Sequence, residues 1–291
     1  MAINPLLRAD SITYAYMPGQ PVLHDVSLAV PPNSAVYLLG HNGCGKTTLL
    51  EILSGIRQPQ GGTVQIGGVD ISRYPANKRA QRLGLVPQIH MPVFAYTVRE
   101  VVVMGRTPHL SFLGTPGRHD YEIVDAAIEQ VGLAALRDRS YTEISGGERQ
   151  LTLIARGLAQ QTDVLLLDEP TAHLDPANQH RVLETVSALT EQNVAFVISS
   201  HNPNNALLYA DQVVVMKAGR IVADGPPDRV LTEEVLSASY DMPIEVIYSG
   251  RTARAILPRR TNGNGVHVAP LESFDEAAIP PAPDREGRAA S

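Results

Sequence analysis

The N-terminal third of the chain contains short runs of apolar and β-branched residues with the length of strands. Residues 11–16 and 22–30 flank a Pro18-Gly19 turn, and residues 63–66 form a further short run. Strands joined by turns rather than by crossover helices pair side by side in opposite directions. These runs therefore predict a small antiparallel sheet.

The second half of the chain alternates between strand and helix patterns. Apolar runs at 164–167, 194–199 and 212–216 predict strands, and helical patterns at 176–189 and 203–209 separate them. This alternation is typical of a parallel sheet flanked by helices, so the fold class is α/β. Two earlier apolar runs also predict strands, at 34–39 and 83–88.

Residues from about 89 to 160 are mainly helical in pattern and separate the two halves of this core. The sequence Thr97-Val98-Arg99-Glu100 is a capping box that opens a helix. Residues 105–117 are rich in Gly and Pro and predict a loop, after which Asp120 is expected to cap the next helix. A further helix is expected over 148–159. The stretch thus predicts an inserted α-helical subdomain.

The C-terminal end changes composition. Residues 226–240 have a helical pattern and residues 244–248 predict a strand. Beyond about residue 258, Gly, Asn, Pro, Ala and charged residues dominate, which predicts disorder. We therefore expect one domain over 1–250 and a largely disordered tail over 251–291.

One segment matches a motif with a known physical role. Residues 40–47, Gly-His-Asn-Gly-Cys-Gly-Lys-Thr, fit the phosphate-binding loop G-x-x-x-x-G-K-[ST] between a strand and a helix pattern. The glycines let backbone N–H groups converge on phosphates, and the positive end of the following helix faces the same anion. Lys46 is expected to reach the β- and γ-phosphates, and the Thr47 hydroxyl to ligate Mg²⁺. The loop alone predicts a nucleotide but no particular function.

Two carboxylates, Asp168 and Glu169, directly follow the apolar run at 164–167. In open α/β sheets, ligands bind at the carboxyl ends of strands. We expect Asp168 to orient Mg²⁺ or its water, and Glu169 to polarise the water that attacks the γ-phosphate.

A second glycine-containing helix start lies at Ser145-Gly146-Gly147-Glu148. Ser145 and Glu148 form a capping box, and the helix start is also a potential anion site. A single triphosphate would use both this site and the loop only if one of them comes from another subunit.

The bulk composition limits the function classes. The chain has 291 residues, 44% hydrophobic and 19% charged, as expected of a soluble globular protein. The net charge of −6, without a concentrated basic run, argues against a nucleic-acid partner. No apolar run has the length of a membrane span and no signal-peptide pattern is present, so we expect a cytoplasmic protein. The single cysteine, Cys44, excludes an internal disulfide and fits a reducing compartment.

Taken together, these motifs resemble the nucleotide-binding subunit of an ATP-binding-cassette (ABC) transporter over about residues 8–245. The resemblance implies an ATP-hydrolysing enzyme with a P-loop NTPase fold. It implies a RecA-like parallel-sheet core, a small antiparallel β subdomain and an inserted α-helical subdomain. The matching motifs are the Q-loop glutamine Gln88, the signature Ile144–Glu148, the Walker B strand 164–168, the D-loop 172–175 and the switch histidine His201.

The resemblance also assigns site residues. Tyr16 is expected to stack on adenine, with Tyr14 as the less favoured choice. The catalytic residues would be Glu169, His201, Gln88 and Lys46, and the Mg²⁺ ligands Thr47, Gln88 and Asp168. The ATP-binding residues would be Tyr16, Gly40, His41, Asn42, Gly43, Cys44, Gly45, Lys46, Thr47, Thr48, Ser145, Gly146, Gly147, Glu148 and Asp175.

Plainer interpretations remain for some of these residues. Gln88 alone is typical of a polar residue at a strand end, and Asp175 before Pro176 is a good helix N-cap. His201 ends an apolar strand, where an imidazole can serve as a core hydrogen-bonding group. Packing is the default role of Cys44, but its position beside phosphate motivates the hypothesis that bulky thiol reagents block ATP binding.

The family mechanism implies two copies facing head to tail with ATP between them. The expected partners are integral membrane permease subunits and, indirectly, an external solute-binding protein. The chain itself is expected to lie at the inner face of the cell membrane. Residues 103–109, 145–150 and 200–204 resemble importers for iron-siderophore, haem, cobalamin or molybdate. We favour an iron-siderophore. The alternative is a stand-alone ATPase of iron–sulfur cluster assembly.

Overall fold

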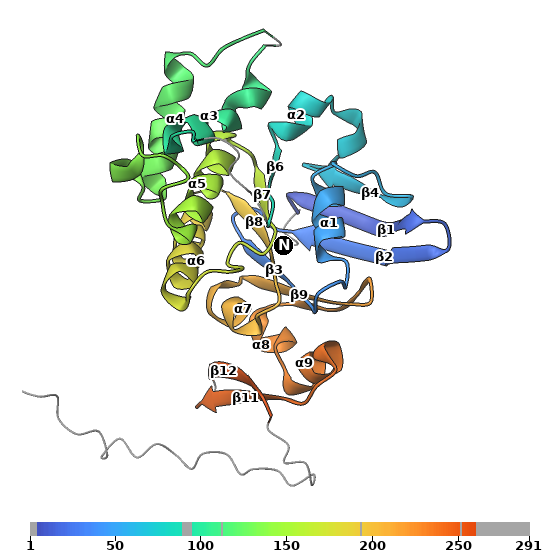
Figure 1. Cartoon of the computed structure of the whole chain (residues 1–291). Helices are drawn as coiled ribbons and strands as arrows, with labels where there is room; N and C mark the ends of the chain where they lie inside the picture. Colours follow the sequence, from blue (N-terminus) through green and yellow to red (C-terminus); the bar gives the residue numbers. More distant parts are fainter. Residues whose placement is uncertain (1–4, 89–94, 112, 193, 251, 260–291) are drawn as a thin grey trace, which may run out of the picture.

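The computed structural model of the protein describes residues 5–88, 95–111, 113–192, 194–250 and 252–259. In this part of the chain a mainly parallel sheet forms the centre. An antiparallel sheet lies on one side of it and a group of helices on the other (Figure 1). The expected α/β fold class is confirmed.

The antiparallel sheet has the order β2-β1-β4-β5 among the described residues. Its strands are β1 (Leu7–Met17), β2 (Gln20–Val30), β4 (Gly61–Ile66) and β5 (Val69–Asp70). Met17 pairs with Gln20 across a tight turn in which Gly19 has φ +81°. Glycine adopts this conformation at no steric cost, which explains why the chain reverses here. The predicted antiparallel sheet is confirmed, and β5 was not predicted.

The central sheet has the order β10-β9-β3-β8-β7-β6 among the described residues. All its strand pairs are parallel except that of β9 with β10. Strand β10 was not predicted from the sequence. The strands β3, β7 and β8 are buried along their whole length, as expected of apolar runs covered on both faces. The bounds are β3 (Ala35–Leu39), β6 (Leu83–Val86), β7 (Val164–Leu167), β8 (Ala195–Ser200), β9 (Gln212–Lys217) and β10 (Arg220–Gly225).

Alternate side chains of β3 belong to different hydrophobic clusters because successive strand residues point to opposite faces. Val36 and Leu38 pack with helix α1 (Lys46–Leu53) and the antiparallel sheet. Tyr37 and Leu39 belong to the cluster formed with α4 (Arg118–Gln130), α5 (Gly146–Ala159) and α6 (Pro176–Thr190). The central sheet is thus covered on both faces.

The helical region contains α3 (Val98–Val103), a 3₁₀ helix η2 (Met104–His109), α4 and η3 (Ala134–Leu136). The capping box of Thr97 and Glu100 is confirmed. The predicted loop at 105–117 is wrong in part, because η2 occupies its first residues. None of the helices in the described ranges is both long and apolar enough to cross a bilayer.

Asp120 does not occupy the N-cap position that the sequence predicted. Helix α4 begins at Arg118, and the carboxylate of Asp120 accepts a hydrogen bond from the backbone N–H of Gly117 at 3.0 Å. An acidic residue in the first turn stabilises a helix start by reaching back to the N-cap amide. The sequence pattern therefore located the helix start but placed its N-cap three residues too late, because the N-cap is Gly117.

The C-terminal part differs from the expectation in two places. The predicted helix at 226–240 is two helices, α8 (Pro227–Val230) and α9 (Glu233–Tyr240), because the Thr232 side chain accepts a hydrogen bond from the N–H of Val235 and starts a new helix. Strand β11 (Ile244–Ser249) pairs with β12 (Thr252–Pro258), so the expected disordered tail does not begin at residue 251. Residues 260–291 lie outside the described residues.

The remaining short elements are η1 (Ile71–Arg73), α2 (Ala76–Ala80) and α7 (Pro203–Tyr209). Helix α7 begins directly after the carboxyl end of β8, with Asn202 as its N-cap. This position places the segment 201–202 beside the end of β7, where Glu169 lies.

Candidate functional site

The glycine-rich loop connects β3 to α1 at the carboxyl edge of the central sheet. A Cβ atom on Gly40 would lie 2.4 Å from the backbone oxygen of Met216, and one on Gly45 would lie 2.8 Å from Cδ2 of Leu23. Both glycines have positive φ, +153° and +108°. Close packing and a left-handed backbone thus require glycine at these two positions. The two glycines let the loop lie over the N-terminus of α1.

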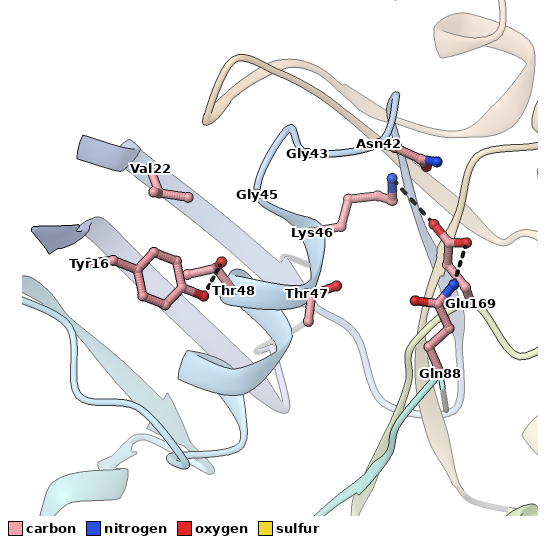
Figure 2. Close-up of a pocket in the computed structure, with 10 residues that line it drawn as sticks. All are labelled: Tyr16, Val22, Asn42, Gly43, Gly45, Lys46, Thr47, Thr48, Gln88 and Glu169. Carbon is pink, nitrogen blue, oxygen red and sulfur yellow. Dashed lines mark hydrogen bonds and ion pairs between the residues drawn. The ribbon is translucent and has the colours of Figure 1, made fainter. Parts of the chain in front are cut away.

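A pocket of about 500 Å³ opens at this loop (Figure 2). Its lining combines the loop and the start of α1 with residues that are distant in sequence. The lining residues are Tyr16, Val22, Asn42, Gly43, Gly45, Lys46, Thr47, Thr48, Gln88 and Glu169. Nine of these ten were expected to bind ATP or to act in catalysis, and only Val22 among them was not expected.

Lys46 extends from the first turn of α1 beneath the loop. Its Nζ donates hydrogen bonds to the backbone oxygens of Gly40 at 2.7 Å and His41 at 3.1 Å, and lies 3.7 Å from Oε1 of Glu169. The side chain is only 5% exposed. Three oxygen neighbours keep the ammonium group at the position where an anionic phosphate would enter.

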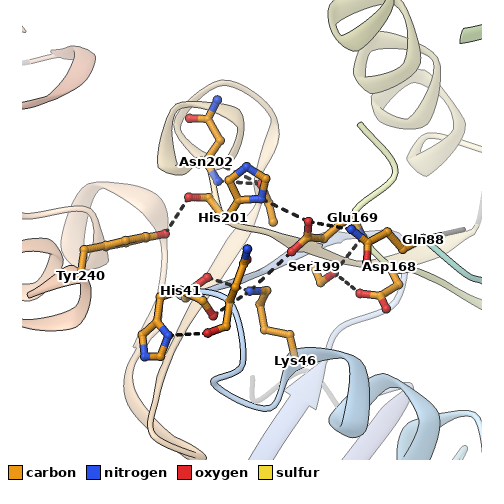
Figure 3. A network of polar contacts seen from close by, with 12 residues as sticks. His41, Lys46, Gln88, Asp168, Glu169, Ser199, His201, Asn202 and Tyr240 are labelled. Atoms are coloured by element: carbon orange, nitrogen blue, oxygen red, sulfur yellow. Dashed lines mark hydrogen bonds and ion pairs between the residues drawn. The ribbon is translucent and has the colours of Figure 1, made fainter. Parts of the chain in front are cut away.

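Glu169 joins three of the sequence-predicted residues (Figure 3). Besides the contact with Lys46, its Oε2 accepts a hydrogen bond from Nε2 of Gln88 at 3.3 Å and lies 3.2 Å from Nδ1 of His201. Gln88 follows β6, Glu169 follows β7 and His201 follows β8. Because these strands are neighbours in a parallel sheet, their carboxyl ends bring the three side chains to one edge.

The carboxylate of Asp168 lies below this cluster and is buried. Its Oδ1 accepts a hydrogen bond from the hydroxyl of Ser199 at 2.6 Å, and the same hydroxyl accepts a hydrogen bond from the backbone N–H of Glu169 at 2.8 Å. Sequence reasoning missed Ser199. A serine within a buried apolar strand is a signal for such a contact, but its partner depends on the order of the strands.

The expected Mg²⁺ ligands supply oxygen atoms, which this ion prefers. Gln88 directs its amide nitrogen to Glu169, which leaves its amide oxygen for another partner. The hydroxyl of Thr47 lines the pocket. Among the described residues, no group of three or more His, Cys, Asp or Glu side chains is arranged to hold a metal ion by itself. The donor set thus fits a Mg²⁺ ion that the nucleotide phosphates help to bind.

Tyr16 lies at the open end of the pocket and is 53% exposed. Its hydroxyl is hydrogen-bonded to Oγ1 of Thr48 at 3.0 Å, and the guanidinium of Arg57 lies 4.8 Å from the ring centroid. Tyr14 contacts the Tyr16 ring edge to face, with centroids 5.2 Å apart. Tyr16 lines the pocket, whereas Tyr14 packs against the Tyr16 ring and does not line the pocket. This difference favours Tyr16 as the adenine-stacking residue.

Cys44 and His41 are the two loop residues whose side chains do not line the pocket. The Cys44 thiol is buried in the hydrophobic cluster around α1, and this burial raises its pKa. Burial limits the access of bulky reagents to this thiol, and the hypothesis that such reagents block ATP binding stays a prediction. The imidazole Nδ1 of His41 contacts the backbone oxygen of Asn42 at 2.7 Å.

The second glycine-containing helix start does not line this pocket. The Ser145 hydroxyl accepts a hydrogen bond from the Glu148 N–H at 3.3 Å, and Glu148 accepts one from the Ser145 N–H at 2.7 Å, which lowers the pKa of Glu148. The predicted capping box is confirmed. Ser145 is exposed, so its free surface is available to a second molecule.

Two further contacts fix the neighbourhood of Ser145. A Cβ atom on Gly147 would lie 2.4 Å from Oδ1 and 3.0 Å from Cβ of Asn178, so α5 and α6 pack closely at this glycine. Asp175 caps α6 by accepting a hydrogen bond from the Asn178 N–H at 3.0 Å, and this bond lowers the pKa of Asp175. The plain capping role of Asp175 is thus confirmed, while its contact with a nucleotide or partner stays a prediction.

Comparison with known proteins places this geometry in a family. The family described as "ABC transporter" matches residues 23–172. A hemin import ATP-binding protein of Rhodococcus jostii is 42% identical over 256 residues, which cover 87% of this chain and 86% of that protein. A cobalamin import ATP-binding protein of Halobacterium salinarum is 39% identical over 257 residues, 86% of this chain and 64% of its own length.

A solved structure has the same architecture. It is an inward-facing conformation of a putative metal-chelate type ABC transporter, with 31% identity and a TM-score of 0.76 over 88% of this chain and 98% of the matched chain. The motifs, the fold and these relatives agree. The chain belongs to the ABC transporter family, and it is an ATP-hydrolysing, ATP-binding member of that family.

Proposed function

We propose that this chain drives the import of a metal chelate by hydrolysing ATP on the inner face of a cell membrane. The observation that carries the ATPase chemistry is the contact of Glu169 with Lys46, Gln88 and His201. The importer role is supported by the hemin and cobalamin import functions of the relatives described above.

Haem is the solute that we propose first. Several relatives that align over more than three quarters of this chain are named for hemin import, and cobalamin is likewise a metal held in a macrocycle. Iron-siderophore, favoured from sequence resemblance alone, shares the iron chelate but no relative described here is named for it. We therefore rank iron-siderophore and molybdate behind haem and cobalamin.

The proposed reaction follows from the positions of the side chains. Lys46 would bind the β- and γ-phosphates, and Thr47, Gln88 and Asp168 would hold Mg²⁺, which neutralises phosphate charge when bound. Glu169 would accept a proton from the attacking water. His201 would contact both the Glu169 carboxylate and the γ-phosphate and keep them in position. Gln88 would also connect the pocket to the helical region.

The proposed assembly has two copies of this chain, two permease subunits and an external solute-binding protein. Each copy would offer its exposed Ser145 to the ATP that is bound on the Lys46 side of the other copy. Binding of ATP would hold the two copies together, and hydrolysis would release them.

The deciding experiment is purification of the tagged chain from detergent-solubilised membranes of its native host. We expect an integral membrane permease to co-purify and to stimulate ATP hydrolysis, and the host lacking this chain to lose growth on haem as iron source. The Glu169→Gln variant is the matched control, because it should capture the permease without restoring growth. Recovery of soluble iron–sulfur assembly proteins in place of a permease would overturn the proposal.

A further inference from the structure

We propose that Ser199 is a positioning residue for ATP hydrolysis. Its hydroxyl connects the carboxylate of Asp168 to the backbone of Glu169, and it thereby sets the direction of the Glu169 side chain (Figure 3). Ser199 is expected to act through Glu169 and not to touch the nucleotide.

Strand register explains how Ser199 reaches both residues. Leu167 of β7 pairs with Ile198 of β8 in parallel, so Asp168 and Ser199 are the next residues along each strand. Residues in register on parallel strands point to the same face of the sheet. A short hydroxyl at position 199 therefore lies directly beside the Asp168 carboxylate.

Burial makes these contacts obligatory. Ser199 is 0% exposed, and a buried hydroxyl without partners is costly. Here the hydroxyl donates to Asp168 at 2.6 Å and accepts from the Glu169 N–H at 2.8 Å. Both the donor and the acceptor function of the serine are thus used at the point where β7 ends.

The backbone of Glu169 shows why an anchor matters there. Glu169 has φ +44°, a left-handed conformation that is unfavourable for a residue with a Cβ atom. The hydrogen bond from its N–H to Ser199 holds this conformation, which turns the carboxylate away from the strand direction toward Lys46, Gln88 and His201. Loss of the hydroxyl would allow the Glu169 backbone to leave its left-handed conformation. The carboxylate would then move away from the water that attacks the γ-phosphate.

This assignment predicts a specific kinetic change. In the full-length chain, Ser199→Ala should lower kcat for ATP hydrolysis roughly 10- to 100-fold, the cost typical of a misplaced catalytic group. KM for ATP should change less than about threefold, because ATP binding relies on the loop, Lys46 and Tyr16. Ser199→Thr keeps the hydroxyl and should recover most of kcat.

The control removes a buried hydroxyl elsewhere. Thr190→Val deletes a side chain hydroxyl that donates to the backbone oxygen of Ser187 at the end of α6. It should lower the melting temperature without lowering kcat at 25 °C. A kcat for Ser199→Ala equal to that of the unmodified chain would overturn the proposal.

A double-mutant cycle tests whether Ser199 acts through Glu169. In the Glu169→Gln background, single-turnover hydrolysis should fall less than about threefold when Ser199→Ala is added. If the two losses instead multiply, Ser199 has an independent role and the proposed coupling is wrong. The steady-state kinetics and the double-mutant cycle need only ATP and the chain itself. They therefore test the role of Ser199 even if no permease co-purifies with the chain.

Discussion

The ammonium group of Lys46 lies 3.7 Å from Oε1 of Glu169, and this ion pair joins the phosphate loop to the carboxyl end of β7. The side chains are 5% and 13% exposed, so solvent screens their attraction only weakly. A γ-phosphate that approaches Lys46 competes with Glu169 for the same ammonium group. We therefore expect ATP binding to free the Glu169 carboxylate for its role toward water.

Replacement of Lys46 tests the phosphate loop. Lys46→Ala removes the buried cation that faces the proposed phosphate position, so the affinity for ATP should fall by at least about 100-fold. Isothermal titration calorimetry with ATP and Mg²⁺ measures the change. Lys78→Ala, in the exposed helix α2, is the matched control and should bind ATP normally. Unchanged affinity of Lys46→Ala would contradict the assignment of the loop.

Replacement of Glu169 separates binding from hydrolysis. Glu169→Gln keeps the size of the side chain but removes the proton acceptor, so hydrolysis should fall roughly 100-fold or more while ATP binding is retained. Release of phosphate and equilibrium binding of labelled ATP measure the two effects. A turnover rate equal to that of the unmodified chain would exclude Glu169 as the base.

Mixing two inactive variants tests the head-to-tail dimer. One variant carries Lys46→Ala and the other Ser145→Arg, and both carry Glu169→Gln so that trapped ATP is not hydrolysed. A mixed dimer has one site with intact Lys46 and intact Ser145, contributed by different chains. Labelled ATP should co-elute with the mixed dimer on gel filtration but not with either variant alone. Failure to trap ATP in the mixture would argue against a shared site.

The ion pair of Arg106 with Asp120 is expected to stabilise the helical region. Arg106 is 4% exposed and donates to Oδ1 of Asp120 at 2.9 Å and to the backbone oxygen of Ala159, the last residue of α5, at 2.7 Å. Arg106→Ala should lower the free energy of unfolding by about 3 kcal/mol, the low end for a buried pair because Asp120 stays partly exposed. Urea denaturation measures the loss. Arg118→Ala, which removes an exposed arginine, should leave the midpoint unchanged.

The same pair predicts a pH dependence. The hydrogen bond from Arg106 lowers the pKa of Asp120, so the Asp120 carboxylate stabilises the fold above the pKa of an unfolded aspartate. This contribution is lost as the pH falls through the lowered pKa of the folded state. The stability difference between the unmodified chain and Asp120→Asn should therefore be constant near pH 7 and shrink below about pH 4. A difference that grows on acidification would contradict this sign.

Features that depend on neighbouring residues in the sequence were predicted well. The loop at residues 40–47 was recognised from its sequence motif. The capping boxes at Thr97 and Ser145 and the cap at Asp175 each depend on backbone amides within three residues of the side chain. Local chemistry of this kind needs no knowledge of the fold. For the same reason, the family motifs were recognisable in the sequence alone.

Features that depend on the order of strands required the tertiary structure. Gln88 and Glu169 are separated by 81 residues, and they meet because β6 and β7 are neighbours in the sheet. Ser199 has a role only because β8 lies beside β7 in one register. Strand β12 lies within the tail that was expected to be largely disordered, and it is ordered by pairing with β11, by the hydrogen bonds of Asn204 with the backbone of Ile256 and by burial of the Ile256 side chain. The sequence by itself determined the chemistry of each local motif, while contacts between distant strands decided which side chains share a site.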